Sequence, residues 1–157
     1  MSRRDVIQAT LDAFGREVGL SKSSNTWYLR QAETIAVINL QRSQYGAQYY
    51  VNVALWLLPL GDADKPKENV CHVRTRLDDL LPPERAARVP ALFDLDTAVD
   101  EEARRDEILS ILRSDLLPVL KACATVDGLR SVAGERLVKR SLVNRAAQEL
   151  LRATPGG

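Results

Sequence analysis

The stretch over residues 34–58, TIAVINLQRSQYGAQYYVNVALWLL, decides the fold of this chain. It contains two runs rich in β-branched and aromatic residues, which are typical of strands, and no proline interrupts it before Pro59. Residues 43–47 separate the two runs, and Gly46 within them can take the positive φ that tight turns use. The pattern predicts two long antiparallel strands joined by a tight turn.

The pairing of these two strands predicts two different faces. Pairing Ser43 with Gln48 places Asn39 opposite Asn52. Because successive side chains of a strand point to opposite faces, this register collects the apolar pairs on one face. Polar side chains near the turn share the other face: Asn39, Gln41, Tyr50 and Asn52. Further from the turn this second face is apolar, so we expect helices to cover that part and to leave the polar side chains at the margin.

The flanking sequence predicts an α+β fold, in which an antiparallel four-stranded meander packs with an N-terminal helix and several C-terminal helices. The expected strands besides the hairpin are residues 26–30 and residues 70–77, and residues 21–25 are expected to be a polar connection. We expect residues 1–157 to form a single domain with these parts: residues 1–20 an N-terminal helix, 26–77 the antiparallel sheet, 82–152 a helical part and 153–157 a flexible tail.

Several boundaries within the helical regions follow from capping residues and prolines. Ser2 is the expected N-cap of the first helix, and Gly19 its expected end. Pro90 is expected to lie in a loop, and Pro118 to kink or divide a long helix that follows Asp100. Apolar residues at helical spacing over residues 137–151 predict one last amphipathic helix.

Composition and charge exclude several broad classes. The formal net charge is +1, so no global field attracts nucleic acid, and no apolar run is long enough to span a bilayer. No signal-peptide region is apparent at the start of the sequence, and the two cysteines, Cys71 and Cys123, form no disulfide framework. We therefore expect a cytoplasmic protein with free thiols, no membrane contact and no nucleic-acid partner.

The second face of the predicted sheet is the best candidate for a binding site. The same registers place two side chains of the first strand and two of the fourth strand beside the polar quartet. The candidate ligand-binding residues are Asn39, Gln41, Tyr50, Asn52, Tyr28, Arg30, His72 and Arg74. Amides and a phenol on a rigid sheet can orient a peptide or a small polar ligand. The alternative is a structural ladder of hydrogen bonds between neighbouring strands.

Other groups with possible chemistry are few. His72 is the only histidine, so we expect no catalytic triad and no metal site with several histidines, and strand alternation places Cys71 on the opposite face from it. A nucleophile pair of Cys123 with His72 is a remaining alternative to a buried core cysteine. We expect no catalytic residues, no cofactor and no metal.

Two short acidic repeats and a basic helix each have a structural and a functional interpretation. Asp62 and Asp64, and likewise Asp94 and Asp96, resemble metal-binding spacings, but they lie in predicted loops, and the second pair is explained by helix capping. The predicted last helix is basic on its outer face, which indicates a solvated surface or, as the alternative, a nucleic-acid contact.

The sequence VINLQRS at residues 37–43, followed by YYVN at residues 49–52, resembles the signature of a bacterial family known only as a domain of unknown function, number 4304 in that series. The resemblance extends from Val6 to about Arg76, and it includes the aromatic pair Trp27 and Tyr28 before the hairpin. It implies an α+β fold. The family has no established activity, so the resemblance implies no catalytic residues.

These observations lead to two functional hypotheses. The first is a non-enzymatic cytosolic protein-interaction module, of which an immunity or antitoxin protein is one version, because the chain is small, has a rigid sheet and lacks recognisable catalytic groups. The second is a sensor of a small polar ligand, or an enzyme, that uses the sheet face around Asn39, Gln41, Tyr50 and Asn52.

Overall fold

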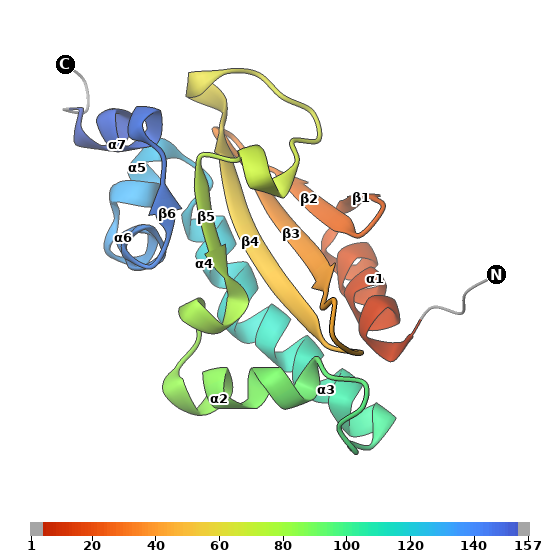
Figure 1. Cartoon of the computed structure of the whole chain (residues 1–157). Coiled ribbons are helices and arrows are strands. Elements are labelled where there is room, and N and C mark those ends of the chain that lie inside the picture. Colours follow the sequence, from red (N-terminus) through yellow and green to blue (C-terminus); the bar gives the residue numbers. More distant parts are fainter. Residues whose placement is uncertain (1–4, 154–157) are drawn as a thin grey trace.

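The computed structural model describes residues 5–153 and confirms the predicted α+β fold. All strands belong to one antiparallel sheet whose order in space follows their order in the chain (Figure 1). The strands are β1 (Ser21–Ser23), β2 (Thr26–Arg30), β3 (Thr34–Arg42), β4 (Tyr49–Leu57), β5 (Val73–Arg76) and β6 (Leu142–Val143). Strands β1 and β6 were not expected from the sequence, so the meander has six strands where four were predicted.

The helices lie before and after this sheet in the sequence. They are α1 (Val6–Val18), α2 (Pro83–Leu92), α3 (Glu101–Ile111), α4 (Leu117–Ala122), α5 (Val126–Arg130), α6 (Val132–Lys139) and α7 (Arg145–Arg152). Three single 3₁₀ turns and one π-helical turn connect them: η1 (Leu58–Leu60), η2 (Glu68–Val70), η3 (Leu77–Leu80) and the π-helical η4 (Leu112–Leu116). Among the described residues, none of the helices combines the length and the apolar character that crossing a bilayer requires.

The predicted register of the central hairpin is confirmed. Asn39 pairs with Asn52, and the amide of Ser43 donates to the carbonyl of Gln48 at 2.8 Å. The expectation for Gly46 was wrong, because the glycines with positive φ in the described chain are Gly19 and Gly61. A six-residue span between the paired residues is long enough to turn without a left-handed residue.

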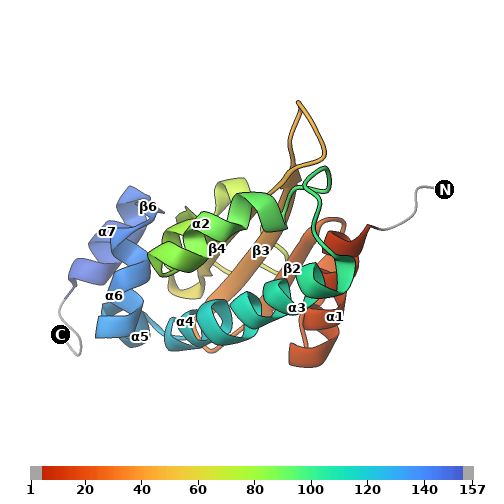
Figure 2. The ribbon, with the colours of Figure 1, turned by 90° about the horizontal axis from the view of Figure 1, so that it is seen from below.

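The two faces of the sheet are covered by different kinds of structure. One face carries the main core, in which Ile38, Val53 and Leu55 pack with apolar side chains of the helices. In Figure 2 the helices α1, α3 and α4 lie along this face. The far half of the second face is covered by the chain between β4 and β5, and Ile35 and Val37 are buried beneath it. The expected helical cover is therefore wrong: a connecting segment with short 3₁₀ turns serves instead.

The ends of the helices follow local hydrogen-bond chemistry. Asp5 is the N-cap of α1, where its carboxylate accepts from the Gln8 amide at 2.8 Å, and Gly19 ends this helix with a φ of 80°. The predicted N-cap Ser2 lies outside the described residues, as does all but the first residue of the predicted tail at 153–157. The long helix changes to a π-helical turn, η4, between α3 and α4, and Pro118 lies in the first turn of α4.

The predicted last helix is interrupted, and this was the main error of the sequence analysis. Residues 142–143 form β6, which pairs with Arg74 and Val73 of β5. The side chain of Asn144 accepts from the Ala147 amide at 2.8 Å and so starts a new helix, α7. A capping asparagine within an apolar periodic pattern is a helix start, not a helix interior. Pro90 was also misplaced, since it lies inside α2.

A buried arginine fixes the end of α2 against α3. Arg104 is 2% exposed, and its guanidinium donates to the carbonyls of Ala91, Leu92 and Thr97. Carbonyls at a helix end have no partner within the helix, so a cation placed there satisfies both their hydrogen bonds and the helix dipole. The neighbouring Arg105 is exposed.

We expect Arg104→Met to lower the free energy of unfolding by about 2–4 kcal/mol, because it keeps the apolar stem and leaves buried carbonyls unsatisfied. Arg105→Met removes the same charge from an exposed position and should change stability by less than about 0.5 kcal/mol. Urea denaturation of both variants measures the difference. Equal effects of the two substitutions would contradict the capping role of Arg104.

Candidate functional site

The polar side chains of the second face form a ladder across three strands. The amide nitrogen of Asn52 donates to the side-chain oxygens of Asn39 and Gln41, both at 3.1 Å. The amide nitrogen of Asn39 in turn donates to the hydroxyl of Thr26 at 3.0 Å. Asn52 is 8% exposed, so these bonds satisfy groups that have little access to water. The structural interpretation of the quartet therefore applies to its amides.

A shallow groove of about 540 Å³ lies over one end of this ladder. Gln41 and Asn52 lie at its floor, β5 forms one side, and the segment from the end of α6 into β6 forms a wall. The hydroxyl of Thr75 donates to the carbonyl of Arg140 at 3.0 Å, which holds this wall against β5. In Figure 1, α6 and β6 lie beside β5 at the edge of the sheet.

The groove is lined by four cationic side chains and two acidic ones: Arg74, Arg76, Lys139 and Arg140, with Glu68 and Asp79. Two of the four cations have carboxylate partners, and one of these pairs joins Lys139 to Glu135 of α6 at 3.1 Å. Arg74 forms an ion pair with Glu68 at 3.0 Å. Arg76 lies instead over the ring of Tyr50, with 4.7 Å between the guanidinium carbon and the ring centroid. Arg140 donates to the backbone carbonyl of Asp79 at 3.2 Å, and no carboxylate within residues 5–153 forms an ion pair with it.

Of the eight predicted site residues, Gln41, Asn52 and Arg74 line this groove. Asn39 and Tyr50 do not line it but contact Asn52 and Arg76, which do.

The other three predicted site residues lie away from the groove. Tyr28 is 6% exposed in the apolar cluster under the connecting segment, and burial raises the pKa of its phenol. Arg30 donates to the carbonyl of Ala63 at 2.8 Å and pairs with Asp62 at 3.2 Å, so it anchors that segment. These two side chains stabilise the cover of the second face. The third, His72, lies beside the same cluster.

His72 packs against Trp56, with 4.3 Å between the ring centroids, and its Nδ1 accepts from the Leu57 amide at 2.9 Å. Burial lowers the pKa of the imidazole, which favours the neutral form that this hydrogen bond requires. The ring nitrogen Nδ1 is thus already committed to the backbone.

The cysteines are both buried, and the structure separates Cys123 from His72. Cys123 belongs to the core on the helix-covered face, where burial raises the pKa of its thiol to about 11. Cys71 packs on the second face, so the expectation that it points away from that face was wrong. The reason is that β5 begins only at Val73, and strand alternation does not apply to the turn before it.

The acidic repeats have structural partners. The capping role expected for Asp94 and Asp96 was wrong, because the N-cap of α3 is Asp100, and Asp94 instead accepts from the amide of Asp96 at 3.0 Å in a local turn. Within residues 5–153, no group of three or more histidine, cysteine, aspartate or glutamate side chains is arranged to hold a metal ion.

The wall of the groove was not predicted from the sequence. Arg76 had a readable signal, since it alternates with Arg74 along β5 and so shares its face. Lys139 and Arg140 were assigned to a solvated helix face, because residues 137–151 were interpreted as one uninterrupted helix. The break at Ser141 brings these cations to the sheet.

A family model described as Domain of unknown function (DUF4304) matches residues 12–122. This match covers more than two thirds of the 157 residues. The chain belongs to this family. The resemblance predicted from the hairpin is thus confirmed, and the match extends through α4, further than the predicted limit near Arg76. No curated protein and no solved structure matches the chain.

The family description assigns no function, and the matched region divides the groove. The floor and β5 side of the groove lie within the DUF4304 match, whereas the wall from Lys139 to Leu142 lies outside it. The lining of the groove therefore comes from both the family region and the sequence that follows it.

We expect Asn39→Ala combined with Asn52→Ala to lower the free energy of unfolding by about 2–3 kcal/mol, because it removes all three hydrogen bonds of the ladder. Gln44→Ala, in the exposed turn, is the matched control and should change stability by less than about 0.5 kcal/mol. Urea denaturation measures both. A double variant as stable as the control would show that the ladder has no structural role.

Stability should fall at acidic pH through His72. Its folded pKa lies below the reference value of 6.5, so the unfolded chain binds more protons between the two values. The contribution is complete above about pH 6.5 and is lost as the pH falls through that value toward the folded pKa. The urea midpoint should therefore fall more for the unmodified chain than for His72→Gln between about pH 7 and about pH 5. Parallel pH profiles would exclude this linkage.

Proposed function

We propose that the chain is a cytoplasmic, non-enzymatic binding protein whose groove receives an acidic segment of a protein partner. The observation that carries the proposal is the lining of the groove, where four cationic side chains face two acidic ones. Arg76 is exposed, and its aromatic contact with Tyr50 orients the guanidinium without neutralising it. Arginine held in this way is a favoured contact for carboxylates.

The shape of the groove favours a segment of a protein over an enclosed small molecule. It is open along the sheet, and a second shallow depression follows it on the other side of Arg74, between η2 and β6. Val70 and Leu142 line that depression and are 55% and 75% exposed. Exposed apolar side chains beside arginines are typical of protein interfaces.

A non-enzymatic role is supported by the hydrogen bonds that the polar side chains already make within the protein. The amides of the floor bond to one another, and His72 accepts a backbone hydrogen bond on its second-face side. These groups would have to give up existing bonds to act on a ligand, which weakens the rival hypothesis of a small-ligand sensor or an enzyme at this face. An immunity or antitoxin protein acts by binding alone, and it is one version of this proposal.

The experiment places a photoreactive phenylalanine analogue at Gln41, in the groove, or at Glu102, exposed on α3, and irradiates the full chain in extract of its native host. We expect one protein to cross-link from Gln41 and not from Glu102, through a segment rich in aspartate and glutamate. Arg76→Glu should then weaken binding of that protein by about tenfold or more, and Arg105→Glu should not, because only the first reverses a charge in the groove.

Two outcomes would overturn the proposal. One is the absence of any cross-linked protein specific to the Gln41 position. The other is a specific partner whose affinity is the same for the Arg76→Glu and Arg105→Glu variants, since charge in the groove would then play no part in recognition.

A further inference from the structure

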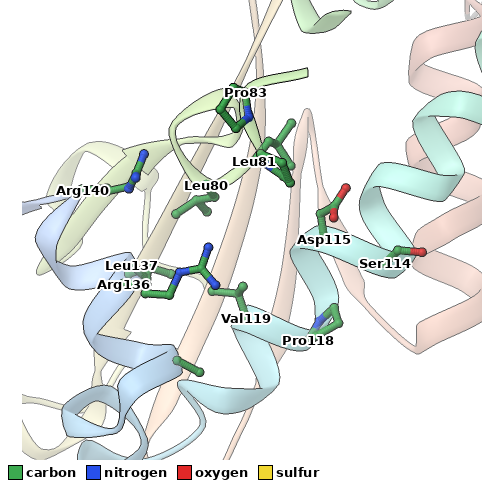
Figure 3. Close-up of a pocket in the computed structure, with 12 residues that line it drawn as sticks. Leu80, Leu81, Pro83, Ser114, Asp115, Pro118, Val119, Arg136, Leu137 and Arg140 are labelled. Atoms are coloured by element: carbon green, nitrogen blue, oxygen red, sulfur yellow. The ribbon is translucent and has the colours of Figure 1, made fainter. Parts of the chain in front are cut away.

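A separate cavity of about 430 Å³ lies where η3, the π-helical turn with α4, and α6 meet (Figure 3). Leu80, Leu81, Val119 and Leu137 give it an apolar lining. Figure 3 shows the side chain of Arg136 extending from α6 toward Val119 of α4. A volume of this size, lined by apolar side chains together with polar and charged groups, is within the range of small-molecule sites.

Three prolines line this cavity. Pro82 and Pro83 line it where the chain leaves η3 and starts α2, and Pro118 lines it where α4 follows the π-helical turn. Proline fixes φ and cannot donate a backbone hydrogen bond, so it limits the ways in which these segments can close on one another. π-helical turns within α-helices are frequent at functional sites.

The acidic side chain at the cavity has an ion-pair partner, whereas the two arginines that line it do not pair with a carboxylate of residues 5–153. Asp115, on one wall, is 3.2 Å from the guanidinium of Arg85, and this ion pair offsets its charge although its Oδ2 makes no hydrogen bond. Arg136 and Arg140 are one helical turn apart and both line the cavity, but no carboxylate of residues 5–153 forms an ion pair with either. Lys139, between them in sequence, does pair, with Glu135 at 3.1 Å. The cavity therefore offers positive charge above an apolar lining.

We propose that this cavity binds a small carboxylate with an apolar body, whose carboxylate is held by Arg136 and whose body contacts Leu80, Val119 and Leu137. A guanidinium binds a carboxylate through two parallel hydrogen bonds, and the apolar body gains by leaving water. An inorganic anion would leave the apolar lining unused, and an organic cation would meet the arginines. This site is distinct from the groove of the proposed function, although Arg140 lines both.

The test combines a ligand titration of the full chain with substitutions of Arg136 and Ala133, which line the cavity and not the groove. The isotope-labelled full chain is titrated with sodium octanoate and, in parallel, with octylammonium chloride, and the backbone amide resonances are followed by NMR. We expect saturable shifts with octanoate at residues of η3, α4 and α6, and no saturable shifts there with octylammonium.

Two variants and one control sharpen the result. Arg136→Gln should weaken octanoate binding by about tenfold or more, which is the loss expected for a charge-assisted hydrogen-bonded pair. Ala133→Trp should abolish binding by filling the cavity from an exposed position of α6. Lys139→Gln removes the same charge from the same helix outside the cavity and should leave octanoate affinity within about twofold.

The proposal is overturned if octylammonium binds as well as octanoate, if the shifts do not saturate or lie elsewhere, or if Arg136→Gln and Lys139→Gln have equal affinity. Neither Arg136→Gln nor Ala133→Trp alters a side chain of the groove, so either result leaves the proposed function untouched. Conversely, loss of partner binding by Arg76→Glu has no bearing on octanoate.

Discussion

The alternation of side chains along β3 and β4 is the constraint on which the rest of this structure depends. Both strands are nine residues long, and the pairing of Asn39 with Asn52 sends every second side chain of each strand to the same face. A shift of one residue would turn the buried apolar set toward the polar face and bury the amides. The helices, the connecting segment and the groove all take their positions from this sorting.

The groove exists because the two faces are covered to different extents. On the core face, helices pack against the hairpin, whereas on the second face the segment between β4 and β5 covers only the half far from the turn. The uncovered half must contact water, and the sequence there supplies amides and arginines. The amides stabilise the sheet, and the arginines at β5 and at the end of α6 give the surface its charge.

The sequence predicted the sheet better than it predicted the groove, and the difference has a physical reason. Register and facing depend on period-two alternation, which is local, so the placement of Asn52 and Arg74 could be read directly. The cover of a face depends on contacts between segments far apart in sequence. Arg30 and His72 were expected on the second face, but Arg30 bonds to the connecting segment and His72 accepts from a backbone amide. No local sequence pattern predicts these two contacts.

In the C-terminal region, too, contacts between distant segments determine a structure that the local pattern does not predict. Apolar periodicity continues without a gap from α6 into α7, and only Asn144 marks the break. The two residues of β6 are too few to be recognised as a strand, since their pairing with β5 stabilises them and their own propensity does not. The wall of the groove thus follows from tertiary contact, and sequence reasoning could not place it.

The segment that covers the second face is also the region where we expect the folded chain to have the lowest local stability. The connecting segment has only two short 3₁₀ turns, and side chains of the sheet hold it through the bond of Trp56 to the Gly61 carbonyl and that of Arg30 to the Ala63 carbonyl. Segments with so few internal bonds open locally at a lower free energy than the strands beneath them. Amide hydrogen exchange over this segment would therefore be faster than over β3 and β4. Each brief opening would expose the apolar surface beneath the segment, next to the cationic groove.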